Sequence, residues 1–136
     1  MTGSAEETFE LGYSIGERIN EPTVFLLDGE LGTGKTVFAK GIAAGLEIDP
    51  LEVNSPTFTI INQHQGRMRM YHIDLYRIQG EEIRQLGLRE MLEEPDTVIV
   101  VEWAERLEGG EMPGAWRVKI NDCGGEFRSL FIVFNT

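Results

Sequence analysis

The sequence is poor in the residues that would cross-link it or place it in a membrane. Its one cysteine, Cys123, excludes an internal disulfide, and two histidines are too few to favour a zinc site. It has no run of eighteen apolar residues and no cationic start followed by an apolar stretch, so neither a membrane span nor a secretory signal is expected. We therefore expect a cytoplasmic protein that folds as one domain over residues 1–136.

Positive charge is also scarce. Lysine and arginine number 12 against 23 aspartates and glutamates, which gives a formal net charge of −11. A field of this sign repels polyanions, so tight direct binding to tRNA or DNA is disfavoured. We expect a protein partner rather than a nucleic acid, and any phosphate must be attracted by local groups.

The sequence does contain a complete phosphate-binding loop pattern. Residues 29–36 read GELGTGKT and fit G-x-x-x-x-G-K-[ST] with no mismatch. The glycines let successive backbone N–H groups turn inward around a β-phosphate, and Lys35 supplies a cation for the β and γ oxygens. Thr36 can ligate Mg²⁺ through its hydroxyl. The pattern predicts binding of a nucleoside triphosphate.

The surroundings of the loop predict an α/β domain. An apolar, β-favouring run at 23–27 precedes it and a helical segment at 37–46 follows it, which is the strand–loop–helix context that the pattern requires. Near the start of the chain, Ser4 and Glu7 form a capping-box pattern ahead of a predicted amphipathic helix.

Further along, two hairpins and a buried strand are predicted. One hairpin joins 57–64 to 67–75 through a two-residue turn, Gln65-Gly66, and the other joins 116–121 to 126–134. Between them, 81–93 is predicted to be helical with a break at Gly87, and 97–101 to be a strand buried on both faces. The elements together indicate a three-layer, P-loop NTPase-like α/β domain with a mixed, partly antiparallel sheet.

Three further segments can supply chemistry. An apolar strand ends in Glu102, which can lie beside Mg²⁺ or can be an ordinary surface acid, and it is one methylene longer than the more usual Asp. Residues 54–59 contain the hydroxyls of Ser55 and Thr57 and form either a nucleotide-dependent switch or a plain turn. Strand alternation places His72 and Asp74 on one face, where an acid can orient water or Mg²⁺ unless that face is simply solvated.

In combination, these segments resemble the bacterial TsaE proteins, also called YjeE, which act in threonylcarbamoyladenosine modification of tRNA. The resemblance spans nearly the whole chain and rests on GELGTGKT at 29–36, SPTF at 55–58, HIDLYR at 72–77 and EWAER at 102–106. It implies that 55–58 form a nucleotide-responsive switch. It also implies ATP hydrolysis by a protein bound to a TsaD–TsaB heterodimer, with tRNA contacted only indirectly.

The pattern and the resemblance together define the expected site, with ATP and Mg²⁺ as its cofactors. The expected catalytic residues are Lys35, Asp74 and Glu102, and the expected metal ligands are Thr36 and Glu102. The residues expected to contact the nucleotide are Gly32, Thr33, Gly34, Lys35, Thr36, Val37, Ser55, Thr57 and Trp103.

Two other functions use the same loop. A small-molecule kinase would transfer the γ-phosphoryl group to an acceptor and would need a basic lid, for which Arg67, Arg69 and Arg77 are the nearby candidates. A non-catalytic module would use ATP only to order 55–58 for a partner. We expect slow hydrolysis by the isolated chain, because no arginine is obviously aimed at the γ-phosphate.

Overall fold

The computed structural model describes residues 2–29, 34–53, 61–74, 90–91, 93–103, 115–125 and 127–134. The elements in chain order are α1 (Ala5–Glu17), β1 (Thr23–Asp28), α2 (Lys35–Gly45), the short 3₁₀ helix η1 (Pro50–Glu52), β2 (Ile61–Gln65), β3 (Arg69–Asp74), β4 (Thr97–Glu102), β5 (Ala115–Asp122) and β6 (Arg128–Phe134).

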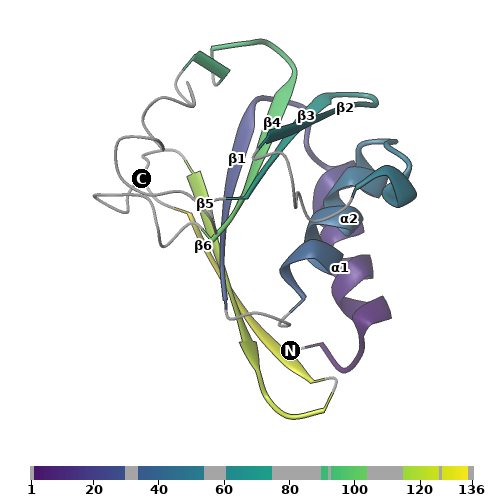
Figure 1. Ribbon diagram of the computed structural model, residues 1–136, viewed down its shortest axis with the longest axis vertical. Coiled ribbons are helices and arrows are strands. Elements are labelled where there is room, and N and C mark those ends of the chain that lie inside the picture. Colours follow the sequence, from purple (N-terminus) through teal and green to yellow (C-terminus); the bar gives the residue numbers. More distant parts are fainter. Residues whose placement is uncertain are drawn as a thin grey trace.

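The strands form a six-stranded mixed sheet in the order β2-β3-β4-β1-β5-β6. The four inner strands run parallel, and β2 and β6 pair antiparallel at the two edges. Helices α1 and α2 lie together on one face of this sheet (Figure 1). This is the mixed, partly antiparallel α/β arrangement that the sequence predicts. It brings the carboxyl ends of the four parallel strands to one edge of the sheet.

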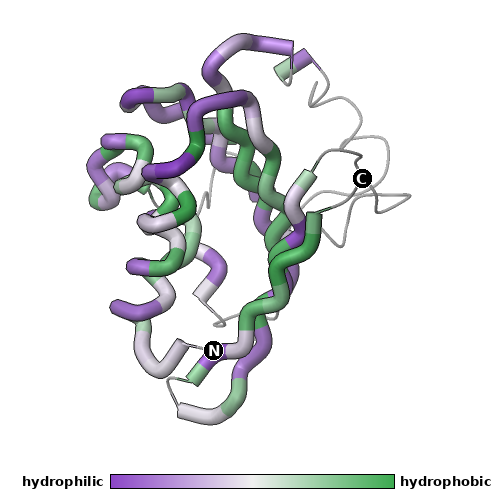
Figure 2. Tube along the Cα trace, turned by 180° about the vertical axis from the view of Figure 1, so that it is seen from behind, coloured by the Kyte–Doolittle hydropathy of each residue, from purple (hydrophilic) through white to green (hydrophobic). Residues whose placement is uncertain are grey.

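The core follows from this arrangement. On the helix-covered face, Phe38 and Ile42 of α2 pack against Leu27 and Val100 of the central strands. The other face has a second apolar cluster that includes Val101. Every residue of β4 is buried, which confirms the strand predicted to be covered on both sides, and the apolar colour of the central strands is visible in Figure 2.

Glycines let the two helices touch backbone to backbone. Gly12 and Gly16 of α1 face Gly41 and Gly45 of α2, so each helix carries one G-x-x-x-G spacing. A Cβ on Gly41 would lie 2.2 Å from the carbonyl oxygen of Phe9. Because that distance is far below van der Waals contact, a side chain at this position would push the helices apart. This contact fixes the position of α2, and therefore the position of its amino end, which follows the phosphate loop.

The helices predicted at the start of the chain and after the loop agree with α1 and α2, except that the start of α2 is shifted. Ser4 caps α1 by accepting a hydrogen bond from the Glu7 amide at 3.1 Å, and the Glu7 carboxylate accepts from the Gly3 amide at 2.7 Å. Helix α2 begins at Lys35 rather than at residue 37. Gly34, at φ 98°, leaves the loop in a left-handed conformation and helical geometry starts at the next residue.

Both hairpins are confirmed, but the turn of the first was predicted wrongly. Residues 66–68 separate β2 from β3, instead of the two-residue turn Gln65-Gly66. The turn packs on the end of α2: the Arg67 amide donates to the Leu46 carbonyl at 2.7 Å, and a Cβ on Gly66 would meet the same oxygen at 2.3 Å. A tertiary contact therefore sets this turn.

Some predictions fall on residues that the structure does not describe. These are the start of the first hairpin at 57–60, Leu75, the predicted helix at 81–93 except for residues 90, 91 and 93, and Glu126 at the start of the last predicted strand. Cys123 is exposed in the turn between β5 and β6. No helix in the described part of the chain has the length and apolar composition needed to cross a bilayer.

Candidate functional site

The sheet brings the predicted site residues to one edge. Strand β1 leads into the phosphate-loop residues, and α2 returns from them across the sheet. In the parallel pairing of β3 with β4, Asp74 lies level with Glu102, and in that of β1 with β4, Leu27 lies level with Glu102. The carboxyl ends of β1, β3 and β4 therefore present their last residues beside the amino end of α2.

The amino end of α2 suits an anion. Gly34 provides no side-chain cap, and the first turn contains no acidic residue. The first-turn amides of a helix have no partner within the helix, and its dipole places partial positive charge at this end. Of the loop residues predicted to bind nucleotide, Gly32 and Thr33 lie outside the described residues, whereas Gly34, Lys35, Thr36 and Val37 lie within them.

Lys35 is almost completely buried, with 5% of its surface exposed. Its ammonium donates a hydrogen bond to the Gly29 carbonyl at 2.5 Å and lies 3.4 Å from the centroid of the Trp103 ring. A cation at this distance from an indole face is attracted by the electron-rich ring. Trp103 itself has φ 62°, a left-handed conformation that costs a bulky residue on the order of 1–3 kcal/mol. The lysine and the tryptophan that sequence reasoning placed near the nucleotide are thus in contact.

Thr36 and Glu102 are also in contact. The Thr36 hydroxyl donates to Glu102 Oε1 at 3.1 Å and lies 3.4 Å from Oε2. Glu102 is 2% exposed, so it is not an ordinary surface acid beyond a core strand. A hydroxyl and a carboxylate are hard oxygen donors of the kind that Mg²⁺ prefers, alongside phosphate oxygens. The donor set therefore fits Mg²⁺.

The described residues contain no group of three His, Cys, Asp or Glu side chains that could hold a metal. Mg²⁺ sites commonly use one or two carboxylates together with substrate phosphates. The pair formed by Thr36 and Glu102 has this character rather than that of a cage built by protein alone.

His72 joins the site as a residue that sequence reasoning did not select. It has no exposed surface, and its Nε2 is hydrogen-bonded to Glu102 Oε2. The alternative of a solvated strand face is therefore wrong for His72, because that face of β3 lies under the helices. Its Nδ1 is buried with no hydrogen-bond partner among the described residues. The sequence places His72 on the same strand face as Asp74, but it does not show that the helices cover this face of β3.

The remaining predicted residues are placed as follows. Asp74 is partly buried at the end of β3, and Val37 is partly buried in the first turn of α2. Ser55 and Thr57 lie outside the described residues, so their predicted role as a switch stays a prediction.

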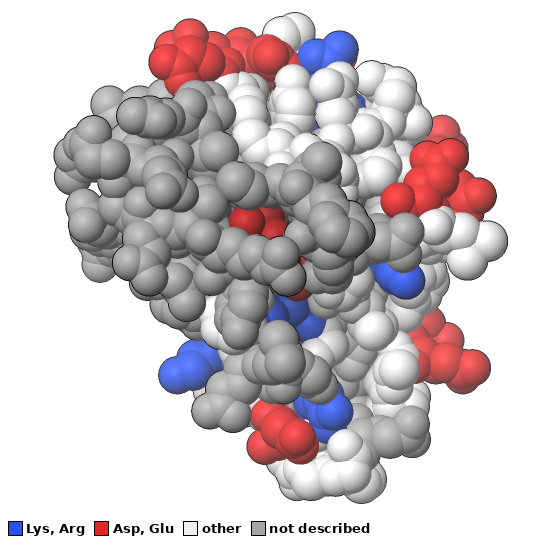
Figure 3. All heavy atoms as spheres, in the orientation of Figure 1, with Lys and Arg blue, Asp and Glu red and all other residues white. Residues whose placement is uncertain are grey.

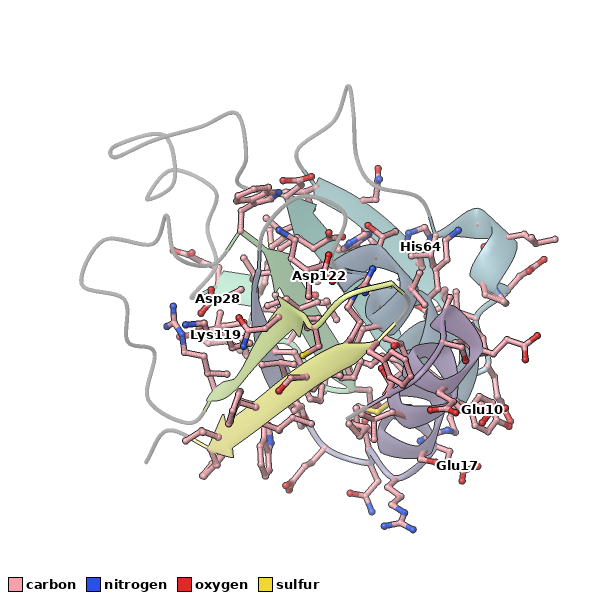
Figure 4. The ribbon with its side chains drawn as sticks, turned by 90° about the horizontal axis from the view of Figure 1, so that it is seen from below. Glu10, Glu17, Asp28, His64, Lys119 and Asp122 are labelled. Carbon is pink, nitrogen blue, oxygen red and sulfur yellow. The ribbon has the colours of Figure 1, made fainter. Side chains whose placement is uncertain are left out.

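An ion pair anchors the strand that enters the loop. Asp28, the last residue of β1, accepts from Arg117 Nε at 2.6 Å, while its Oδ1 is buried with no hydrogen-bond partner in the described part of the chain. Figure 4 shows Asp28 and Lys119 close together, in agreement with their pairing on neighbouring strands. The ion pair with Arg117 of β5 thus anchors Asp28 at the point where the chain leaves the sheet.

Two other arginines are held away from this edge. The Arg67 guanidinium binds backbone carbonyls at the carboxyl ends of both helices, including those of Ile19 at 2.7 Å and Gly16 at 3.0 Å. Arg69 pairs with Glu94 at 2.9 Å, and hydrogen bonds with Tyr71 and Glu94 raise its pKa. Neither guanidinium is placed to form part of a lid over phosphates.

A cavity of about 300 Å³ lies elsewhere. Its lining includes Thr23 and Phe25 from the amino half of β1, Ile19 after α1, and Trp116 and Ile132 from β5 and β6. Because the phosphate loop follows the carboxyl end of β1, this cavity belongs to the other end of the strand.

Comparison with known proteins agrees with this architecture. The family model described as "Threonylcarbamoyl adenosine biosynthesis protein TsaE" matches residues 2–129. The TsaE protein of Bacillus subtilis is 42% identical over 130 residues, which are 95% of this chain and 80% of that protein. Its counterpart in Treponema pallidum is 40% identical over 114 residues, which cover 83% of this chain and 82% of the relative.

The TsaE protein of a Nostoc species is 41% identical over 106 residues, 75% of this chain, and the match spans only 65% of that relative's length. The crystal structure of YdiB from Bacillus subtilis superposes with a TM-score of 0.77 at 31% identity, covering 98% of this chain and 83% of that chain. The P-loop type of α/β fold predicted from the sequence is confirmed, and these matches show that the chain belongs to the TsaE family.

Proposed function

We propose that the protein acts in the biosynthesis of threonylcarbamoyladenosine in tRNA as a Mg²⁺-dependent ATPase that works with a TsaD–TsaB heterodimer. The relatives are named as tRNA threonylcarbamoyladenosine biosynthesis proteins, which supports the pathway. The observation that carries the ATPase proposal is the contact between Thr36 and Glu102 at 3.1 Å, directly beside the buried Lys35 at the start of α2. These are the three chemical groups that a phosphate loop needs.

Each group has a distinct task in this proposal. The α2 amides and Lys35 bind the phosphates, and Lys35 leaves the Trp103 ring to reach the β and γ oxygens. Thr36 and Glu102 are the residues that would hold Mg²⁺, and the ion would supply positive charge to neutralise the phosphate oxygens. Asp74, level with Glu102 on the next strand, positions the attacking water. Trp103, whose ring contacts Lys35, shields the phosphate site from bulk solvent.

The charge distribution supports a protein partner. The chain carries a net charge of −11, and on the face shown in Figure 3 the described lysine and arginine side chains are scattered rather than joined in a stripe. Direct binding to tRNA would need clustered positive charge, because counterion release from phosphates drives such binding. A component that docks on TsaD–TsaB and leaves tRNA to them has no such need.

Turnover by the isolated chain should be slow. Arg67 and Arg69, the described members of the basic group near the hairpin, are engaged with helix carbonyls and with Glu94. An arginine directed at the γ-phosphate is worth about 10³–10⁵ in rate, and we propose that the partner complex supplies this contribution. The same engagement argues against a kinase that closes an arginine-rich lid.

The experiment compares phosphate release and tRNA modification in a reconstituted mixture with TsaD and TsaB. Lys35→Ala and Glu102→Ala should abolish both, whereas Arg69→Ala, which alters a surface ion pair, should leave both unchanged. Loss of hydrolysis with full modification would mean that ATP is only a ligand. Transfer of phosphate to a metabolite, instead of release as inorganic phosphate, would establish a kinase.

A further inference from the structure

We propose that His72 is a positioning residue that fixes the Glu102 carboxylate toward Thr36 before Mg²⁺ binds. The inference rests on the proposed function, because it takes Glu102 and Thr36 as the residues that hold the ion. It goes beyond that function by giving a task to His72, which lies in one of the motifs that carry the family resemblance but to which neither the resemblance nor the loop pattern assigns a role.

The direction of the hydrogen bond between His72 and Glu102 follows from the ionised state that a carboxylate ligand of Mg²⁺ has. An ionised carboxylate only accepts, so the Nε2 atom of His72 carries the proton and donates it to Glu102 Oε2. The other carboxylate oxygen, Oε1, accepts from the Thr36 hydroxyl at 3.1 Å. Glu102 is thus held from two sides, by β3 and by α2, and its orientation is fixed by donors on separate elements.

The length of the acidic side chain explains why such a donor is needed. Glu102 has one more rotatable bond than the aspartate usual at this place, and ordering a glutamate side chain costs up to about 2 kcal/mol. A hydrogen bond from a buried neighbour offsets part of this cost before the ligand arrives. In metal sites, groups of this kind orient the ligating atoms, and their loss typically reduces affinity about 10–100-fold.

The surroundings of His72 argue against a purely structural role. Alternation along β3 places it on the same face as Met70, and both residues have no exposed surface. Burying a ring nitrogen without a partner costs about 1–3 kcal/mol, and His72 Nδ1 has none among the described residues. An apolar residue would fill this position at lower cost, so the benefit of His72 lies in its hydrogen bond to Glu102, the one hydrogen bond that its side chain makes among the described residues.

The test compares two amide substitutions of different reach. In His72→Gln the side-chain amide extends as far as Nε2 of histidine and can still donate to Glu102. In His72→Asn the amide corresponds to the position of Nδ1 and cannot reach. Binding of a non-hydrolysable ATP analogue is measured as a function of Mg²⁺ concentration, and again in excess EDTA.

We expect His72→Asn to raise the half-saturating Mg²⁺ concentration about 10–100-fold. His72→Gln should stay within about threefold of the parent protein, and affinity in EDTA should be unchanged in both variants. Equal shifts in the two variants, or no shift in either, would overturn the positioning role. If the parent protein binds no Mg²⁺-nucleotide, the proposed function itself fails. If the parent binds normally and His72→Asn binds equally well, only the positioning role of His72 fails.

A measurement on the unmodified protein guards against variants that do not fold. The chain has only two histidines, so ¹⁵N-imidazole NMR signals can be assigned with a His64→Phe variant. We expect His72 to be the tautomer protonated at Nε2, with that proton protected from exchange in the absence of metal and nucleotide. Protonation at Nδ1 instead, or rapid exchange of the Nε2 proton, would contradict the hydrogen bond on which the proposal stands.

Discussion

Substitution of Arg67 by alanine should cost stability without affecting the phosphate site. The guanidinium donates to the Ile19 carbonyl at 2.7 Å, to Gly16 at 3.0 Å and to Gly45 at 3.3 Å. Its own amide donates to the Leu46 carbonyl at 2.7 Å. One residue in a turn of the sheet thus satisfies carbonyls at the carboxyl ends of α1 and α2, where a positive charge is also favoured by both helix dipoles.

These contacts determine how much stability Arg67→Ala should lose. A hydrogen bond to a charged group contributes about 1.5–3 kcal/mol net, and the two shorter bonds should lie near the lower figure because Arg67 is exposed to solvent on one side. Releasing a long side chain from its ordered state recovers part of this energy. We therefore expect Arg67→Ala to lower the free energy of unfolding by about 2 kcal/mol, which for a chain of this size corresponds to roughly 8 °C in Tm. Arg67→Lys should lose about half as much.

Urea unfolding followed by circular dichroism measures this effect. The matched control is Arg69→Ala, which removes a solvent-exposed ion pair to Glu94 and should cost clearly less than Arg67→Ala does. If Arg67→Ala costs no more than the control, Arg67 does not stabilise the helix ends in this way. A loss of nucleotide affinity in folded Arg67→Ala would instead favour the role of a lid arginine.

Three other changes test separate features. Gly41→Ala should cost about 3 kcal/mol in urea unfolding, because the new Cβ would lie 2.2 Å from a backbone oxygen of α1. The pKa of His64 is lowered by burial and by a neighbouring histidine. As the pH falls below about 6.5, the unfolded chain therefore binds a proton at His64 more readily than the folded chain does. Stability should therefore fall with acid, and His64→Phe should flatten this dependence. In a Trp116→Phe background, Mg²⁺-ATP should change the fluorescence of Trp103 as Lys35 leaves its ring.

Each of these has a result that would contradict it. A Gly41→Ala protein as stable as the parent would mean that the helices tolerate separation. An unaltered pH profile in His64→Phe would assign the acid sensitivity to other groups. A fluorescence response to nucleotide that persists in Lys35→Ala would show that the lysine is not its source.

The sequence predicted the elements whose signals are local. Ser4 and Glu7 mark the start of α1, and the apolar run that forms β4 is long enough to require burial on both faces. The turn at 66–68 was missed because its shape depends on the Leu46 carbonyl at the end of α2, a contact that no local pattern encodes. The G-x-x-x-G spacings at Gly12 and Gly41 are visible in the chain, but their meaning depends on the two helices being neighbours.

In the candidate site, too, some residues could be predicted from local sequence patterns and others could not. Lys35 and Thr36 are predictable because their places are fixed relative to the loop glycines. Glu102 is predictable as the acid at the end of a buried strand. His72 was not selected, because alternation assigns it to a face but the covering of that face depends on α2. The left-handed backbone of Trp103 also depends on tertiary contacts and has no sequence signature.

The proposal that the loop binds Mg²⁺-ATP is best tested by calorimetric titration of the purified protein with ATP, in the presence and absence of Mg²⁺, together with the Lys35→Ala variant. We expect saturable binding of one nucleotide per chain that is strengthened by Mg²⁺. A charge-assisted contact of about 1.5–3 kcal/mol should make binding about 10–100-fold weaker in the variant. No affinity for Mg²⁺-ATP, or equal affinity in Lys35→Ala, would contradict the proposal.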